Sequence, residues 1–137
     1  MVQYKLMADL IVTTSALEVA CNKIDESLIK AGVHTVLLVD QAGNVVASRG
    51  GGPKEIDIIS LAALTAANFA ATSELAKLIG EDDFTLLFHK GKKDSLHFVR
   101  INSDLIMVSI FDDNVSLGLV RLRVAEVIKV IKELFEP

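Results

Sequence analysis

The middle of the chain carries sixteen consecutive residues, 58 to 73, without one charged side chain, and no other segment constrains the fold as strongly. Wound as an α-helix at about 100° per residue, the segment and the turns after it form one apolar stripe of the kind that covers a core. The members of this stripe are Ile58, Leu61, Ala62, Thr65, Phe69, Thr72, Ala76 and Ile79.

The opposite stripe of the same helix is also free of charge. Its members are Ile59, Ala63, Ala66, Ala67, Ala70 and Ser73. A helix that faces water normally carries Lys, Glu or Gln there, and small side chains let another backbone come close. Because wide exposed apolar patches mark interaction sites, we predict that this helix packs against a second protein surface. A central helix buried within one chain is the alternative. A membrane span is a weaker one, because the stretch is shorter than the roughly 20 apolar residues that a bilayer requires.

Composition narrows the class of protein. A length of 137 residues fits one domain with one core. Hydrophobic residues make up 51% of the chain and aromatic residues only 5%, which suits an obligate oligomer. The net charge of -4 argues against a nucleic-acid surface.

The single cysteine, Cys21, is expected to be a small buried side chain in a helix. One cysteine excludes an internal disulfide and fits a reducing compartment. The first residues lack a signal-peptide pattern, so we expect a cytoplasmic protein.

Local patterns predict eight elements. A first helix is expected from about Thr14 to Ala31, stopped by Gly32. Strands at 34–40 and 45–48 flank turn residues at 41–44 and predict a hairpin. Residues 49–53 should break regular structure before the long helix, which is expected from about Glu55 to Ile79. Strands at 84–89, 96–101 and 105–111 then form a meander, and an amphipathic helix closes the domain at about 116–135.

The order of elements predicts the fold class. The connections inside each strand group are too short for parallel crossovers, so the sheet should be mainly antiparallel. The strands at 35–39 and 105–111 are apolar at nearly every position, which requires cover on both faces. We therefore predict an α+β fold. It is a three-layer α/β/α sandwich with a five-stranded sheet and the order α-β-β-α-β-β-β-α.

Residues that could carry chemistry are few. The histidines His34, His89 and His97 have no sequence-local partners at metal-ligand spacing, so surface or structural roles are expected. The pairs Asp82/Asp83 and Asp112/Asp113 sit beside strand ends, where turn and capping use explains them better than a cation. Gly50 to Gly52 precede Lys54 and a helix start, but the Walker spacing is absent. We expect no catalytic residue, no cofactor and no metal, hence not an enzyme.

Four stretches together resemble a known family. They are residues 60–72, residues 78–81, the Phe-His-Lys-Gly of 88–91, and the Ser-Leu-Gly-Leu-Val-Arg-Leu-Arg of 116–123. In this order they resemble the Roadblock family of dynein-light-chain type, closest to its prokaryotic MglB-like branch. The resemblance covers residues 12 to 135 as a single domain. It implies a Roadblock-type, profilin-like sandwich, in agreement with the architecture predicted above.

The resemblance also implies partners. Members form homodimers in which the second helices pack side by side and edge strands join. The implied dimer residues are Ala63, Ala66, Ala67, Ala70, Phe84, Leu86 and Phe88. The MglB-like branch binds a small Ras-like, MglA-type GTPase and stimulates its hydrolysis without binding GTP itself. The implied docking residues are Arg49, Lys54, Glu55, Ile59, Ala63 and Ala67.

Two further arginines and two other functions stay open at this stage. Arg121 and Arg123 fall on the last helix, in reach of Glu126, and we expect surface ion pairing rather than an arginine finger. A non-catalytic scaffold of Roadblock type is the alternative function. A small-molecule sensor that uses space beneath the sandwich is a less favoured one, since fold resemblance alone does not decide function.

Overall fold

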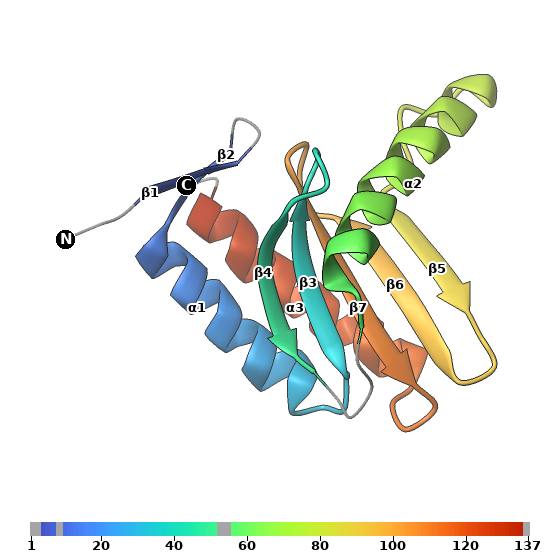
Figure 1. Cartoon of the computed structure of the whole chain (residues 1–137). Coiled ribbons are helices and arrows are strands. Elements are labelled where there is room, and N and C mark those ends of the chain that lie inside the picture. The colour runs from blue at the N-terminus through green and yellow to red at the C-terminus, as the bar shows by residue number, and fades with distance from the viewer. Residues whose placement is uncertain (1–3, 8–9, 52–55, 136–137) are drawn as a thin grey trace.

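The computed structural model describes residues 4–7, 10–51 and 56–135. Figure 1 shows how the elements are arranged. In chain order they are β1 (Tyr4–Met7), β2 (Leu10–Thr13), α1 (Thr14–Ile24), the π-helical turn η1 (Asp25–Ile29), β3 (Thr35–Asp40), β4 (Val45–Gly50), α2 (Ile58–Leu78), β5 (Leu86–Lys90), β6 (Asp94–Arg100), β7 (Leu105–Asp112) and α3 (Leu117–Phe135).

Five strands form one antiparallel sheet in the order β4-β3-β7-β6-β5. Strand β3 is buried along its whole length, and the central strand β7 is buried at every position except the last. Continuous apolar strands need cover on both faces, and the structure provides it. The predicted five-stranded antiparallel sheet and the predicted order of helices and strands are confirmed.

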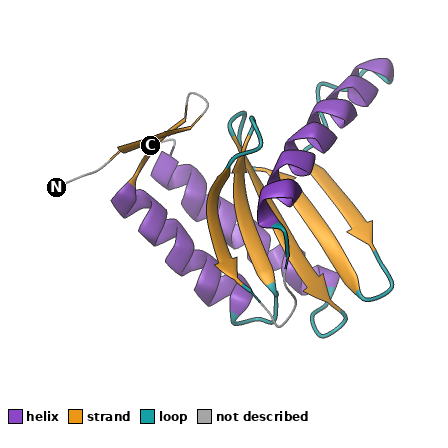
Figure 2. Cartoon of the chain, in the orientation of Figure 1, coloured by secondary structure: helices purple, strands orange, loops and turns teal. Residues whose placement is uncertain are grey.

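Helices cover both faces of the sheet (Figures 1 and 2). The helices α1 and α3 lie on one face, and α2 crosses the other. Two separate apolar clusters result. The larger one joins α1 and α3 to the sheet through residues such as Ile24, Leu38, Met107, Val124 and Ile131. The smaller one, beneath α2, consists of Leu37, Val39, Ala62, Phe69, Phe98, Ile106 and Val108.

The beginning of the chain differs from the prediction. Before Thr14, the strands β1 and β2 pair with each other in antiparallel fashion, and Figure 1 shows them apart from the main sheet. The predicted first helix is present and is capped by Thr13, whose hydroxyl accepts from the Ala16 amide at 3.1 Å. Its last turn widens into η1, where the Lys30 amide reaches back to the Asp25 carbonyl at 3.0 Å.

The expected break at residues 49–53 comes later than predicted. Arg49 and Gly50 still belong to β4, paired with Val36 and Thr35 of β3. Gly50 has φ +81, and a Cβ atom there would lie 2.2 Å from the His34 carbonyl oxygen. Glycine at position 50 therefore allows the close backbone approach through which the β3–β4 pairing continues. From residue type alone, the same glycine had indicated a break in the strand. Residues 52–55 lie outside the described part of the chain, and so does the predicted helix start at Glu55.

Helix α2 follows the predicted core stripe for most of its length. Asp57 caps it, accepting from the Ser60 amide at 3.1 Å. Ala62, Thr65, Phe69 and Ala76 are buried on the sheet, whereas Ile79 is 69% exposed, against the prediction. The chain leaves helical geometry at Ile79 and turns at Gly80, whose φ is +80. The side chain of Ile79 therefore no longer follows the helical stripe.

Helix α2 is also the one described helix that is long and apolar enough to cross a membrane by length and composition. The same length and composition arise in a helix that packs on a sheet on one side and on another protein on the other. Here the inner side of α2 contacts the sheet through the buried residues named above.

Candidate protein-interaction surface

The outer face of α2 is apolar and open to solvent. Four large side chains on it, Ile59, Leu64, Leu75 and Leu78, are 76%, 67%, 55% and 82% exposed. Small exposed residues complete what we call the α2 outer face. The full set is Ile59, Ala63, Leu64, Ala67, Ala70, Ala71, Leu75 and Leu78. Charge enters only in the last turns, where Lys77 Nζ pairs with Glu74 Oε1 at 3.0 Å. The sequence pattern therefore corresponds to a real surface without charge over its first four turns.

Part of the small-residue stripe is used inside the chain. Gly43, in the β3–β4 turn with φ +89, lies so close to α2 that an added Cβ would be 3.0 Å from the Ala63 Cα atom and 3.5 Å from the Ala66 Cβ atom. The short side chain of Ala66 is half-buried there. A backbone does approach this stripe, but at Ala63 and Ala66 it is the chain's own turn and not the predicted second protein. Ala67 and Ala70 remain open.

The free edge of β5 adjoins this region at the end of the sheet. Within the described sheet β5 pairs only with β6, so its other side presents unpaired backbone groups. Leu86 is 40% exposed, whereas Phe88 stacks on Phe111 with ring centroids 6.2 Å apart. Both side chains point to the α3 face of the sheet. Phe84 lies half-buried before the strand. The predicted dimer residues thus divide between the α2 outer face and the β5 edge.

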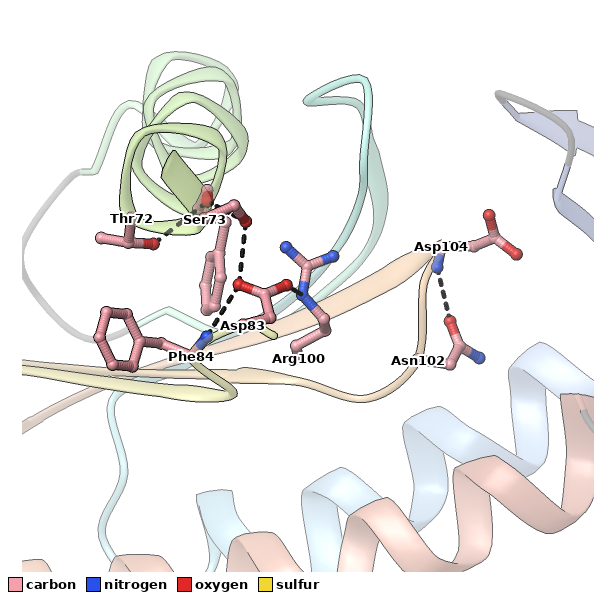
Figure 3. Close-up of polar contacts among 8 residues, drawn as sticks. Thr72, Ser73, Asp83, Phe84, Arg100, Asn102 and Asp104 are labelled. Atoms are coloured by element: carbon pink, nitrogen blue, oxygen red, sulfur yellow. Dashed lines mark hydrogen bonds and ion pairs between the residues drawn. The ribbon is translucent and has the colours of Figure 1, made fainter. Parts of the chain in front are cut away.

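A polar network fixes α2 relative to that edge (Figure 3). Asp83 follows α2 and accepts hydrogen bonds from the Ser73 hydroxyl at 2.9 Å and from the Phe84 amide at 2.8 Å. Its second oxygen lies 3.4 Å from Nε of Arg100, on β6. The Arg100 guanidinium sits 5.0 Å from the centre of the Phe69 ring. The turn role predicted for Asp83 is confirmed, whereas its partners Ser73 and Arg100 lie in segments that the local sequence pattern did not connect to it.

Arg49 lies on the opposite face of the sheet from α2. It pairs in register with Val36, whose side chain belongs to the α1/α3 core, and it forms a bidentate ion pair with Asp25. Hydrogen bonding to Arg49 lowers the pKa of Asp25. Of the predicted GTPase-binding residues, the structure brings Ile59, Ala63 and Ala67 together and separates Arg49 from them. Lys54 and Glu55 lie outside the described residues.

The arginines of α3 lie on that same opposite face. Arg123 pairs with Glu126 at 3.5 Å, as the spacing predicts. Neither arginine lies near the α2 outer face, because the sheet separates α3 from α2 (Figure 1).

Cys21, expected to be buried, is only half-buried on α1, and burial raises the pKa of its thiol.

The fold also brings together His34, Asp94 and Asp112, which the sequence did not connect. Their potential ligand atoms lie within 4.8 Å of one another, and His34 Nε2 is 2.7 Å from Asp112 Oδ2. Asp112 also accepts from the Asn114 amide at 2.8 Å. The His34 hydrogen bond is the main cause that lowers the pKa of Asp112. The His34–Asp112 hydrogen bond and the position of Asp94 opposite Asp112 in the β6–β7 register account for this geometry. The side chains could also offer a nitrogen and carboxylate oxygens to a metal.

Comparison with known structures defines the class of protein first. The fold is that of profilin: Acanthamoeba castellanii profilin IA superposes with a TM-score of 0.58 at 16% identity, covering 82% of this chain and 97% of that one. The Roadblock/LC7 domain model matches residues 22–111. The chain therefore belongs to the Roadblock/LC7 family. No curated protein matches it.

Two solved structures narrow the family to its MglB-like branch. Myxococcus xanthus MglB is 41% identical, with a TM-score of 0.78, covering 90% of this chain and 96% of that one. The gliding protein MglB from Thermus thermophilus is 30% identical, with a TM-score of 0.87, covering 96% and 98%. Roadblock domains of this kind are regulatory or adaptor domains rather than classical enzymes.

Proposed function

We propose that this protein is a cytoplasmic homodimer that regulates a small Ras-like GTPase of the MglA type. The observation that carries the proposal is the α2 outer face, an uncharged apolar surface beside an open sheet edge, in a chain 41% identical to Myxococcus xanthus MglB. Exposed apolar patches of this kind mark protein interaction sites. One MglB structure is itself described as having a tetrameric arrangement, which supports self-association in this branch.

The proposed dimer joins two copies through β5 and α2. An unpaired edge strand is a template for pairing with a second chain, so two β5 strands can extend the sheet across a twofold axis. Ala67 and Ala70 offer no side chain beyond Cβ, which lets two α2 helices approach closely. The proposed interface comprises Ala63, Ala66, Ala67, Ala70, Phe84, Leu86 and Phe88, with Ala63 and Ala66 contributing at the margin of the β3–β4 turn.

The proposed GTPase contact uses the N-terminal half of α2. Ile59, Ala63 and Ala67 share the exposed side of that half, and Lys54 and Glu55 precede it in the sequence. We leave Arg49 out of the contact, because its guanidinium is bonded to Asp25 on the other face of the sheet.

Activation without a catalytic arginine is the mode that this geometry favours. An arginine finger can raise GTP hydrolysis by roughly 10³–10⁵. Arg121 and Arg123 lie on α3, with the sheet between them and the α2 outer face, and Arg123 is already paired with Glu126. A regulator of this kind would therefore act by reshaping the GTPase site, and it would need neither an active site nor a cofactor of its own.

Single-turnover GTP hydrolysis tests the proposal. The small Ras-like GTPase encoded nearest this protein is loaded with GTP and followed with and without excess regulator. We expect faster hydrolysis. Complex formation with unchanged turnover would assign the chain to the scaffold alternative, and absence of any complex would contradict a GTPase partner.

Ala67→Arg tests whether α2 provides the contact surface. A charged, long side chain in the centre of the α2 outer face should abolish self-association or the GTPase complex. Light scattering and pull-down measure the two. Val19→Arg is the matched control, because Val19 is a 47% exposed apolar residue on α1, on the far side of the sheet. If both variants behave as wild type, α2 is not the contact surface.

A further inference from the structure

A cavity of about 250 Å³ lies between α3 and the β5–β6 end of the sheet, on the face opposite α2. Its walls are almost entirely apolar. They comprise Leu86, Val99, Val124, Ala125 and Ile128, together with His97 and Arg121. An apolar cavity with a few converging polar groups is the usual form of a small-molecule site. The α2 outer face and the proposed GTPase contact do not include it, and it shares Leu86 with the proposed dimer interface.

His97 is the unusual member of this lining. Its side chain is 1% exposed, and neither ring nitrogen has a hydrogen-bond partner among the described residues. Directly opposite in the β6–β7 register stands Ser109, whose hydroxyl is also buried without a described partner. Buried polar groups are nearly always hydrogen-bonded, and one left unpaired is costly. Of these two groups His97 lines the cavity, and its unpaired ring nitrogens indicate that a polar group of a ligand can complete its hydrogen bonding.

The charges around the cavity favour an anion. Arg121 is exposed on α3 and forms no hydrogen bond or ion pair with any residue that the structure describes. Burial, and to a smaller extent the Arg121 charge, lowers the pKa of His97 to about 4. At neutral pH the imidazole is therefore uncharged and offers one N–H donor. No carboxylate lines this cavity among the described residues.

We propose that the cavity binds a small apolar monocarboxylate. Its carboxylate would pair with the Arg121 guanidinium and, after a small shift of the buried imidazole toward the cavity, accept the His97 N–H. Its hydrocarbon body would contact Val99, Val124 and Ile128. The size is sufficient, because an engineered cavity of about 150 Å³ binds benzene, and the present cavity is larger than that. The inference does not depend on the GTPase proposal.

Nuclear magnetic resonance titration of the full chain with sodium hexanoate tests the inference. We expect saturable shifts of amide signals on β6 and α3 and of the His97 ring. Hexan-1-ol, which has the same carbon skeleton without the charge, should bind about tenfold more weakly, because a charge-assisted hydrogen bond is lost. Arg121→Gln should weaken hexanoate by a similar factor and leave hexan-1-ol unchanged.

Ala125→Leu separates the cavity from the rest of the surface. Ala125 is exposed on α3 and lines the cavity, so a leucine there fills the space in a residue type that helices accept. This variant should keep the wild-type spectrum elsewhere and lose hexanoate binding. The proposal is overturned if hexanoate gives no saturable shifts, if hexan-1-ol binds as well as hexanoate, or if Ala125→Leu binds normally.

Discussion

The two faces of the sheet are covered by helices to different degrees. On the α1/α3 face two helices lie side by side, and their inward residues form a cluster that includes Ile24, Leu28, Val124 and Ile131, all at most 2% exposed. On the α2 face one helix covers a smaller cluster, and its outward side keeps Leu64 and other large apolar residues exposed.

The difference bears on the role of the uncharged residues 58–73 of α2. Helix α3 carries charged residues on its outer side and an apolar stripe inside, as a helix that faces water should. Helix α2 is apolar on both sides, although only one apolar side is needed to pack against the sheet. The excess apolar surface on α2 is therefore not needed to build the protomer, which supports the proposal that α2 contacts a second protein surface.

The largest expected effect on stability comes from a substitution on the α1/α3 face. Leu38, in the centre of β3, is fully buried in the α1/α3 cluster. Leu38→Ala should lower the free energy of unfolding by about 2–5 kcal/mol, because it removes buried methyl groups and leaves a cavity. Urea denaturation measures the change. A loss below about 1 kcal/mol, closer to that of an ordinary surface change, would contradict the view that this face holds the protomer together.

His97 should make the same face sensitive to acid. Its pKa is about 4 in the folded protein and about 6.5 when unfolded. The unfolded chain therefore binds the proton first, and stability falls as the pH drops from about 6.5 and levels off below about 4. The total loss is about 3 kcal/mol.

His97→Phe should remove that part of the pH dependence. Denaturation at about pH 7 and about pH 4 measures it. An unchanged slope in His97→Phe would show that the ring is not buried in its neutral form.

A smaller effect is expected in the polar network that joins α2 to β6. Asp83→Ala removes the acceptor of Ser73 and Phe84 and leaves Arg100 without its ion pair. We expect a loss of about 1–3 kcal/mol and faster hydrogen exchange at the amides around β5. Asp82→Ala, one residue earlier and exposed, is the control. Equal effects of the two changes would mean that the network does not hold α2 to β6.

The smallest effect on the stability of the protomer should come from a substitution on the α2 outer face. Leu75 is 55% exposed on α2. Leu75→Lys should change the intrinsic free energy of unfolding by no more than about 0.5 kcal/mol, while the dependence of the melting temperature on protein concentration decreases. Thermal unfolding over a range of concentrations measures both. A large loss at high dilution would place Leu75 in the protomer core instead.

Most of the architecture could be read from local pattern. Continuous apolar runs at 35–39 and 105–111 required cover on both faces, and short connections required antiparallel pairing, so the three layers followed. The pairing of β1 with β2, the end of β4 at Gly50 and the exposure of Ile79 did not. Each depends on backbone geometry, such as the approach of Gly50 to the His34 carbonyl, that residue type does not encode.

The sequence by itself determined that α2 has no charged side over residues 58–73, because periodicity assigns residues to faces without reference to any neighbour. Only the tertiary structure decided which groups from distant segments meet. It placed Arg49 with Asp25 instead of with α2, joined Asp83 to Arg100, and left His97 buried opposite Ser109 beside a cavity. These contacts depend on strand order and register across the sheet, which are set by the packing of the whole chain and not by any local stretch of it.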